Sequence, residues 1–207
     1  MDLNTLTELK NTHEAAVEQL LLAHKDNEAF FAEYSYMRDE YCFDIGGKAE
    51  PAELKAAQER LSMALPPSYV EFVTTVGLTR FRSNAYKMLP PDQIATLSDV
   101  LETQWKVNWS REHPQLKANT DKIVVFALGN ADQQDFYYVC FDYRDNTQSA
   151  ERPLFYFCQD EIWDASHFAQ QPSEVGKSTI DTFIMQGFEH ALEEADELIT
   201  CFLEEYE

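Results

Sequence analysis

Residues 65–77 have the sequence LPPSYVEFVTTVG, and this stretch decides the fold because it encodes one complete short helix. Proline suits the first turn of a helix, where the N–H that it lacks would be unpaired anyway, so the helix is expected to start at Pro67 or Ser68. Gly77 ends it, because glycine tolerates the left-handed backbone of a helix terminus. Apolar side chains recur between these ends at helical spacing, namely Tyr69, Phe72, Val73 and Val76.

Two further helices are expected before this stretch. Glu50-Pro51 starts one of them, and the prolines at 66 and 67 end it. The segment from Asn4 to about Tyr41 predicts the other, because apolar residues recur there at helical steps without Pro or Gly. A break of this segment into two helices at Asp26-Asn27 is an alternative. Gly46-Gly47 is the expected boundary between the two regions.

The sequence after residue 77 is less regular. A short strand is expected over residues 85–89. Pro90-Pro91-Asp92 then opens a predicted helix whose apolar side chains recur every three or four residues up to Trp105, so Trp105 is expected in the core. The polar stretch 108–121 contains Pro114 and predicts a loop.

The strongest strand signal lies between residues 122 and 158. Three runs rich in Val, Ile and aromatic residues cover 122–128, 136–143 and 153–158. Only short polar connections separate them. Neighbouring strands with short loops favour an antiparallel meander, because parallel strands need long crossovers.

The C-terminal segment from Ser178 to Glu207 predicts a long acidic helix. Its apolar residues recur at steps of three or four, and it contains nine acidic residues and no Lys or Arg. Glu189, Glu193 and Glu197 lie four residues apart on one face, where like charges repel. Such a face either presents negative charge to a cationic partner or is a solvated surface, and the sequence leaves both interpretations open.

These elements define the fold class as α+β, with a mostly antiparallel sheet flanked by helices. An N-terminal helical extension, residues 1–47, is expected before an α+β domain, residues 48–207, that ends in the long acidic C-terminal helix. A chain of 207 residues buries enough surface for a stable core without disulfides or metal ions.

The charge of the chain is its most unusual feature. It has 37 Asp and Glu residues against 16 Lys and Arg residues, which gives a formal net charge of −21. Nucleic acid and anionic membrane surfaces would be repelled, because binding them requires cationic side chains. A positively charged protein would be attracted and would associate faster. The alternative is that the charge serves solubility alone.

The cysteines and the N-terminus predict a cytoplasmic protein. The first residues have no basic and apolar segment of the kind that a signal peptide needs. Cys42, Cys140, Cys158 and Cys201 are well separated and form no C-x-x-C pair, so they are expected to be reduced core thiols rather than zinc ligands. No metal ion or other cofactor is expected.

The stretch 65–77 and the helix before it resemble the signature of the SUKH superfamily, which has an acidic helix, then Leu-Pro, an aromatic residue, Phe and a closing Gly. The runs 126–130 and 136–142 resemble the paired strands of that family, and 153–160 resembles its next strand. The resemblance covers roughly residues 50–188. It implies an α+β fold similar to a yeast regulator of cell-wall synthesis, without catalytic residues. For bacteria it implies an immunity protein of a polymorphic toxin system, which binds and neutralises a secreted toxin.

The sequence offers little that points to catalysis. The chain contains no metalloprotease, P-loop or nucleophile-elbow motif. Carboxylate pairs such as Asp132 with Asp135 and Asp160 with Glu161 occur in any acidic chain. They become acid/base machinery only when their surroundings separate their pKa values, which the sequence cannot reveal. The chain is therefore not expected to be an enzyme.

A partner-binding surface is the better hypothesis. Tyr143 and Trp163 lie among acidic residues, and aromatic anchors inside a charged rim are typical of interface hot spots. The alternative for both rings is a core or capping role. The predicted partner-binding residues are Asp132, Asp135, Asp142, Tyr143, Asp145, Asp160, Glu161, Trp163, Asp164, Glu189, Glu193 and Glu197.

The resulting hypothesis is a stoichiometric toxin inhibitor. Many toxins that act in the cytoplasm attack nucleic acids and carry basic clefts, and a protein of charge −21 could plug such a cleft as a phosphate mimic. A regulatory protein-interaction scaffold is the first alternative. A metal-dependent hydrolase is the second.

Overall fold

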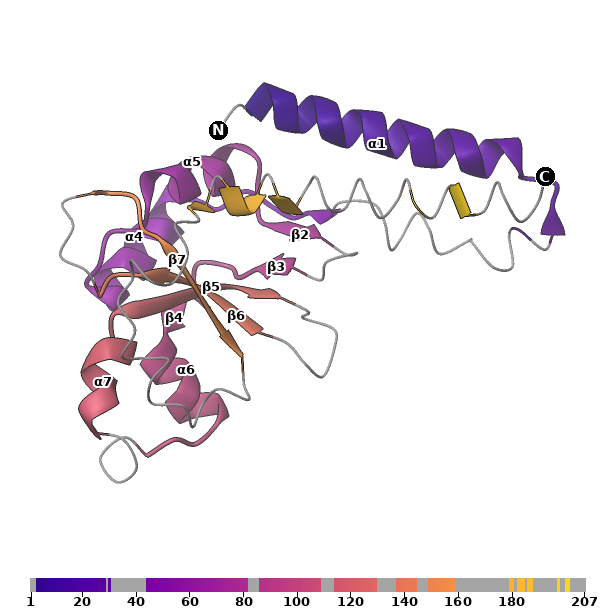
Figure 1. Cartoon of the computed structure of the whole chain (residues 1–207). Coiled ribbons are helices and arrows are strands. Elements are labelled where there is room, and N and C mark those ends of the chain that lie inside the picture. Colours follow the sequence, from indigo (N-terminus) through magenta and orange to yellow (C-terminus); the bar gives the residue numbers. More distant parts are fainter. Residues whose placement is uncertain are drawn as a thin grey trace.

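The computed structural model of the chain describes residues 3–28, 30, 44–81, 86–108, 114–129, 137–144, 149–158, 179–180, 182–184, 186–187, 197 and 200–201. Figure 1 shows these residues as ribbon, in which helices surround a twisted sheet. The fold class is α+β with an antiparallel sheet, as the sequence predicts.

The sheet has seven strands, and every pair of neighbours is antiparallel. The strand order is β1-β2-β3-β5-β6-β7, with β4 pairing with β5 off this path. The strands are β1 Asp44–Ile45, β2 Thr79–Phe81, β3 Tyr86–Met88, β4 Ala95–Thr96, β5 Ile123–Gly129, β6 Tyr137–Asp142 and β7 Leu154–Cys158. The predicted meander is therefore β5, β6 and β7, which are also the longest strands.

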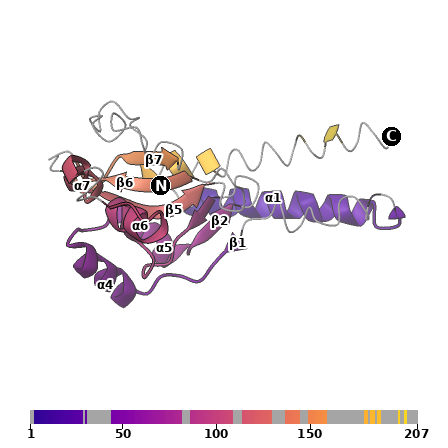
Figure 2. The same cartoon turned by 90° about the horizontal axis from the view of Figure 1, so that it is seen from below.

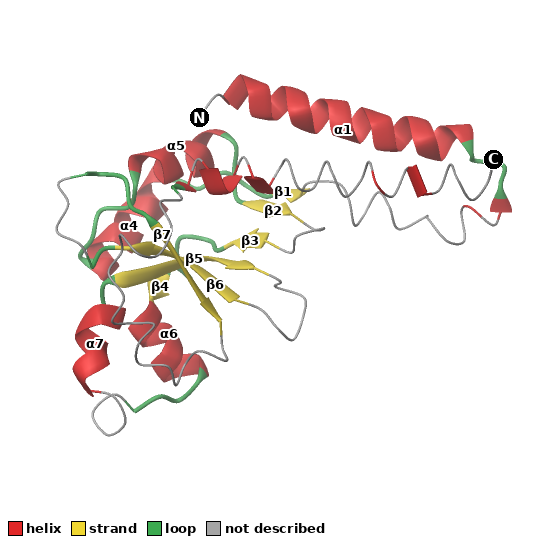
Figure 3. Ribbon diagram, viewed as in Figure 1, coloured by secondary structure: helices red, strands yellow, loops and turns green. Residues whose placement is uncertain are grey.

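Helices cover both faces of this sheet (Figure 3). The helices of the described residues include α1 Leu3–Ala23, α4 Pro51–Leu61, α5 Pro67–Thr75, α6 Leu97–Gln104 and α7 Pro114–Thr120. In Figure 1, α4 and α5 lie above the sheet, and α6 and α7 lie below it. The sheet is thus the middle of three layers.

Helix α5 is the predicted helix of residues 65–77, and its ends have clear physical causes. Pro67 is its first residue, and Gly77 follows it with a positive φ of 129°, which strongly favours glycine. The Glu151 carboxylate accepts hydrogen bonds from the Ser68 N–H at 3.0 Å and from the Ser68 hydroxyl at 2.6 Å. A carboxylate at a helix N-terminus also complements the helix dipole. Glu151 therefore fixes α5 to the loop between β6 and β7.

The core contains an aromatic cluster between α5 and the sheet. The rings of Phe126 on β5 and Phe141 on β6 stack in parallel, with centroids 4.0 Å apart. Tyr69 of α5 meets both rings edge-on, at 5.6 Å and 5.3 Å. All three side chains are fully buried. Each such ring pair adds about 1 kcal/mol beyond the burial of its area.

Two predictions between residues 90 and 121, the start of one helix and a loop, are wrong. Helix α6 begins at Leu97, not at Pro90, because Pro90–Gln93 form a turn and Ala95–Thr96 form strand β4. The Thr96 hydroxyl caps α6 by accepting a bond from the Asp99 N–H at 3.1 Å, a start signal that the sequence contains. Helix α7 occupies part of the stretch that was expected to be a loop.

The region around Gly46-Gly47 is part of the sheet. The Gly46 N–H donates to the Leu78 carbonyl at 2.7 Å, and the Leu78 N–H donates to the Gly47 carbonyl at 3.2 Å. A Cβ at position 46 would lie 2.8 Å from the Leu78 carbonyl oxygen, so only glycine allows this approach. Strand β1 therefore lies inside the predicted extension 1–47, and the division of the chain at residue 47 remains a prediction.

The predicted N-terminal and C-terminal helices can be compared with the structure only at the residues that it describes. Helix α1 ends at Ala23 and a turn follows at 24–26, which favours the predicted break at Asp26-Asn27. Figure 2 shows α1 projecting beyond the β1–β2 edge of the sheet.

Near the C-terminus, the ring of Phe183 packs edge-on against two others, with its centroid 4.8 Å from that of Tyr86 and 6.0 Å from that of Phe126. The rest of the predicted acidic helix lies mostly outside the described residues and remains a prediction.

The buried hydroxyl of Tyr69 predicts an unusual mutational effect. It has no hydrogen-bond partner among the residues that the structure describes, whereas the half-buried Tyr143 hydroxyl donates to the Ala64 carbonyl at 2.7 Å. We expect Tyr69→Phe to stabilise the protein by about 1 kcal/mol, because it removes an unpaired buried polar group. The matched variant Tyr143→Phe should cost about 1 kcal/mol, because it removes a hydrogen bond. Urea denaturation measures both, and a clear loss of stability in Tyr69→Phe would contradict the assignment.

Stability should fall at alkaline pH. Burial raises the pKa of Tyr156 from its ordinary value of 10 to about 12, and it also raises the pKa values of Tyr69, Tyr137, Tyr138 and Tyr143. The unfolded chain therefore releases protons near pH 10 that the native protein retains. This stabilisation is complete below pH 10 and is lost as the pH rises towards about 12. Urea midpoints compared between about pH 8 and about pH 11 should show the loss, and Tyr156→Phe should reduce it.

Candidate functional site

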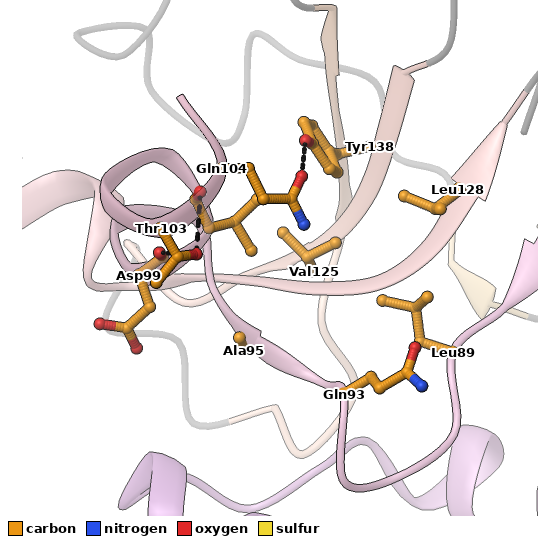
Figure 4. A pocket seen from close by; sticks show the side chains of 10 residues that line it. Leu89, Gln93, Ala95, Asp99, Thr103, Gln104, Val125, Leu128 and Tyr138 are labelled. Atoms are coloured by element: carbon orange, nitrogen blue, oxygen red, sulfur yellow. Dashed lines mark hydrogen bonds between the residues drawn. The ribbon is translucent and has the colours of Figure 1, made fainter. Parts of the chain in front are cut away.

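A cavity of about 460 Å³ lies between α6 and the sheet, and we call it the α6 pocket (Figure 4). It lies on the face of the sheet opposite to Tyr69. Its lining consists of Leu89, Gln93, Ala95, Asp99, Val100, Thr103, Gln104, Val125, Leu128 and Tyr138.

The floor of the α6 pocket is apolar and rigidly placed. Val125 and Leu128 of β5 both contribute to it, together with Leu89, Ala95 and Val100. Strict alternation would put Val125 and Leu128 on opposite faces of the sheet, because they are three residues apart. A register shift between Val125 and Ala127 brings them to the same face. This β-bulge therefore shapes the floor.

A chain of hydrogen bonds runs along the rim of the α6 pocket. The Trp105 indole N–H donates to the Tyr138 hydroxyl at 3.0 Å, and the Tyr138 hydroxyl donates to Gln104 Oε1 at 2.7 Å. The indole N–H can only donate, so the single proton of Tyr138 must go to Gln104. The Gln104 side-chain NH₂ then has no acceptor among the described residues. Figure 4 shows this nitrogen pointing toward the floor, near Val125.

The hydrogen-bond chain of Trp105, Tyr138 and Gln104 is maintained at neutral pH. Burial raises the pKa of Tyr138, so its hydroxyl stays protonated and continues to orient Gln104. On the other side of the floor, Gln93 presents a second side-chain amide (Figure 4). The arrangement can therefore bind a ligand that is apolar in its body and has neutral hydrogen-bonding groups at its edges.

Negative charge predominates beside the pocket. Asp99 is the only charged side chain among the described residues of the lining. Lys117 lies nearby, but it is held by Asp121 at 3.0 Å and faces Glu102 at 3.7 Å. Lys106, at the end of α6, donates to the Thr103 carbonyl at 2.7 Å. These cations are thus occupied by internal acceptors.

Asp142, a predicted partner-binding residue, lies inside the protein. Its carboxylate accepts bonds from the Arg144 guanidinium at 2.6 Å and 3.0 Å, and only 1% of its side chain is exposed. The guanidinium in turn lies 4.7 Å from the centre of the Phe155 ring. The ion pair holds the end of β6, so Asp142 itself does not face a partner in this structure.

Tyr143, the next predicted residue, is half-buried. Its hydroxyl bonds to the Ala64 carbonyl, and the Arg152 guanidinium lies 4.7 Å from the centre of its ring. These contacts correspond to the alternative of a structural role. Glu197 is exposed. The other predicted residues lie outside the part of the chain that the structure describes, namely Asp132, Asp135, Asp145, Asp160, Glu161, Trp163, Asp164, Glu189 and Glu193.

Three side chains that the sequence predicts to be in the core, those of Trp105, Cys158 and Cys201, are exposed. Trp105 is 37% exposed, not in the core, because α6 ends at Gln104 and the ring projects from its C-cap. Cys140 is buried and its burial raises its pKa, but Cys158 and Cys201 are exposed rather than core thiols. The α6 pocket itself has no short motif, since its residues come from separate strands and one helix.

None of the described helices is long and apolar enough to cross a membrane. Over the described ranges, no group of three or more His, Cys, Asp and Glu residues is arranged to hold a metal ion.

A comparison with known protein families identifies the family of the chain. Residues 48–184 match the SMI1 / KNR4 family (SUKH-1), a range that runs from just before α4 to Ile184. The chain therefore belongs to the SMI1 / KNR4 family (SUKH-1). No curated protein and no solved structure matches the chain significantly. Membership of this family is consistent with the role of an immunity protein.

The buried ion pair predicts a large effect of a small change. Asp142→Asn should destabilise the protein by about 3–5 kcal/mol, because it leaves the Arg144 guanidinium buried without its anion. The double variant Asp142→Asn with Arg144→Met removes both charges and should recover much of this loss. Urea denaturation of the two single variants and the double variant measures the coupling. Additive effects would contradict a direct pair.

Proposed function

We propose that this protein is an immunity protein, which binds and neutralises a cognate secreted toxin domain in the cytoplasm. The observation that carries the proposal is a SUKH-1 domain, residues 48–184, in a chain whose net charge is −21. A stoichiometric inhibitor needs only a complementary surface, and a strong field of one sign raises the rate at which an oppositely charged partner is found. No catalytic role is proposed.

The distribution of charge along the chain supports a basic partner. Two of the cations are held by internal acceptors, Arg144 by Asp142 and Lys117 by Asp121. The Asp and Glu residues are spread along the whole sequence, including the predicted partner-binding acids around residues 132–135 and 160–164. These segments would supply the anionic contacts.

A nuclease is the toxin class that fits best. Its cleft binds a phosphate backbone through cationic side chains, and a row of carboxylates can occupy those side chains in place of phosphates. Binding of this kind blocks the substrate without any reaction. The partner is therefore expected to be basic, and its association with this protein should weaken steeply as salt is added.

Co-expression with the toxin domain encoded directly upstream tests the proposal. We expect the wild-type protein to restore growth and to co-purify with that domain. Asp160→Lys with Glu161→Lys should weaken both readouts, because it replaces anionic contacts with repulsion. The control variant Glu59→Lys with Glu71→Lys makes the same change of charge on the exposed surfaces of α4 and α5.

The outcomes separate the candidate functions. Failure of the wild-type protein to protect or to co-purify would refute the immunity function. Binding to several unrelated cellular proteins instead would indicate a regulatory scaffold. Equal weakening by both charge-reversal pairs would show that overall charge, rather than the 160–164 segment, determines binding.

A further inference from the structure

We propose that the α6 pocket receives one extended peptide segment of the partner, with an apolar side chain on its floor, a main-chain carbonyl on the Gln104 amide and a cationic side chain on Trp105. This inference rests on the proposed function, because it assumes a protein partner, and it names the segment chemistry which that partner must present.

The shape of the pocket suits a side chain with its adjoining backbone. Its volume of about 460 Å³ lies in the range typical of ligand sites. The floor is formed by Val125, which is fully buried beneath it, and by Val100 and Leu89, which are nearly so. Buried side chains keep fixed positions, so the site is preformed and little conformational entropy is lost on binding.

The hydrogen-bond chain on the rim defines what the occupant must carry. Trp105 and Tyr138 together force the Gln104 oxygen to accept, and the Gln104 NH₂ is left as a donor beside the floor. An apolar occupant without an acceptor would bury this group unpaired, which is unfavourable. The occupant therefore carries an acceptor close to its apolar group.

The charges exclude an anionic acceptor. Of the lining residues that the structure describes, Asp99 alone is charged, and the whole protein carries a charge of −21, so a carboxylate or phosphate would be repelled. A peptide carbonyl is a neutral acceptor and is always adjacent to a side chain. Gln93 lies on the other side of the floor and can pair with both the N–H and the C=O of the same segment (Figure 4).

The Trp105 ring indicates which residue type the partner segment carries next to its apolar side chain. Its ring is 37% exposed at the end of α6, and its orientation is fixed by the bond to Tyr138. Tryptophan is the best aromatic partner for a cation. An Arg or Lys next to the apolar side chain can thus stack on this ring, in agreement with a basic partner.

Two pocket variants test the inference with the upstream toxin domain as the probe. Gln104→Glu keeps an acceptor for Tyr138 but replaces the NH₂ by a carboxylate oxygen, so affinity should fall about tenfold or more. Ala95→Phe fills the cavity from β4, where aromatic residues are well tolerated, and should have a similar effect. The control Gln19→Glu makes the same charge change on α1, outside the matched domain, and should leave affinity unchanged.

A second measurement needs no toxin. The indole N–H of Trp105 and the side-chain NH₂ of Gln104 give separate signals in a ¹H–¹⁵N NMR spectrum. The capped peptide N-acetyl-Arg-Leu-Arg-amide should shift both signals, and N-acetyl-Glu-Leu-Glu-amide should shift them far less. Neither peptide should shift the Trp105 signal of the Ala95→Phe variant.

The results distinguish the two proposals. If the wild-type protein binds the toxin domain but Gln104→Glu and Ala95→Phe bind it equally well, the pocket is not the docking site and the immunity function stands. Tighter binding by Gln104→Glu would show that the amide meets a cation rather than a carbonyl, which also overturns the inference. Equal shifts with both peptides, or none, would refute the assigned segment chemistry.

Discussion

The structure depends on the contact between one helix and one pair of stacked rings. Tyr69 of α5 meets Phe126 and Phe141 edge-on, and these two rings join β5 to β6. The contact is apolar apart from the Tyr69 hydroxyl, which is buried and finds no hydrogen-bond partner in the described part of the chain. Tolerating that cost implies that ring packing outweighs it at this position. Because Glu151 also binds the first turn of α5, the β6–β7 connection is placed by the same helix.

The pocket on the opposite face is a consequence of this core. The bulge in β5 lets Phe126 reach the rings under α5 while Val125 and Leu128 turn to the other side. Tyr138 comes from β6 and has the opposite orientation to its buried neighbour Val139, so it reaches α6. The packing that stabilises one face thus determines which side chains shape the other.

The sequence predicts those elements whose signals are local. Residues 65–77, the helix after Glu50 and the three long strands follow from periodicity and from Pro and Gly positions, and each is found. Strands β1, β2 and β4 have two or three residues, too few for a period, and they exist only because a neighbouring strand pairs with them. The burial of Asp142 could not be foreseen either, because a carboxylate at a strand end is rarely buried unless it is paired, and only the fold places the Arg144 guanidinium beside it and over Phe155.

The charge and the pocket contribute to recognition in different ways. A field from many carboxylates acts over about a Debye length, so it accelerates encounter with any basic protein but discriminates poorly between them. A preformed cavity acts only at contact. A partner that leaves the pocket amide unpaired or the apolar floor unfilled dissociates faster. The acidic residues are spread along the whole chain, whereas the α6 pocket is built on strands and a helix inside the matched domain. Specificity for one partner therefore has to come from features like the pocket, because net charge alone would make every basic protein a ligand.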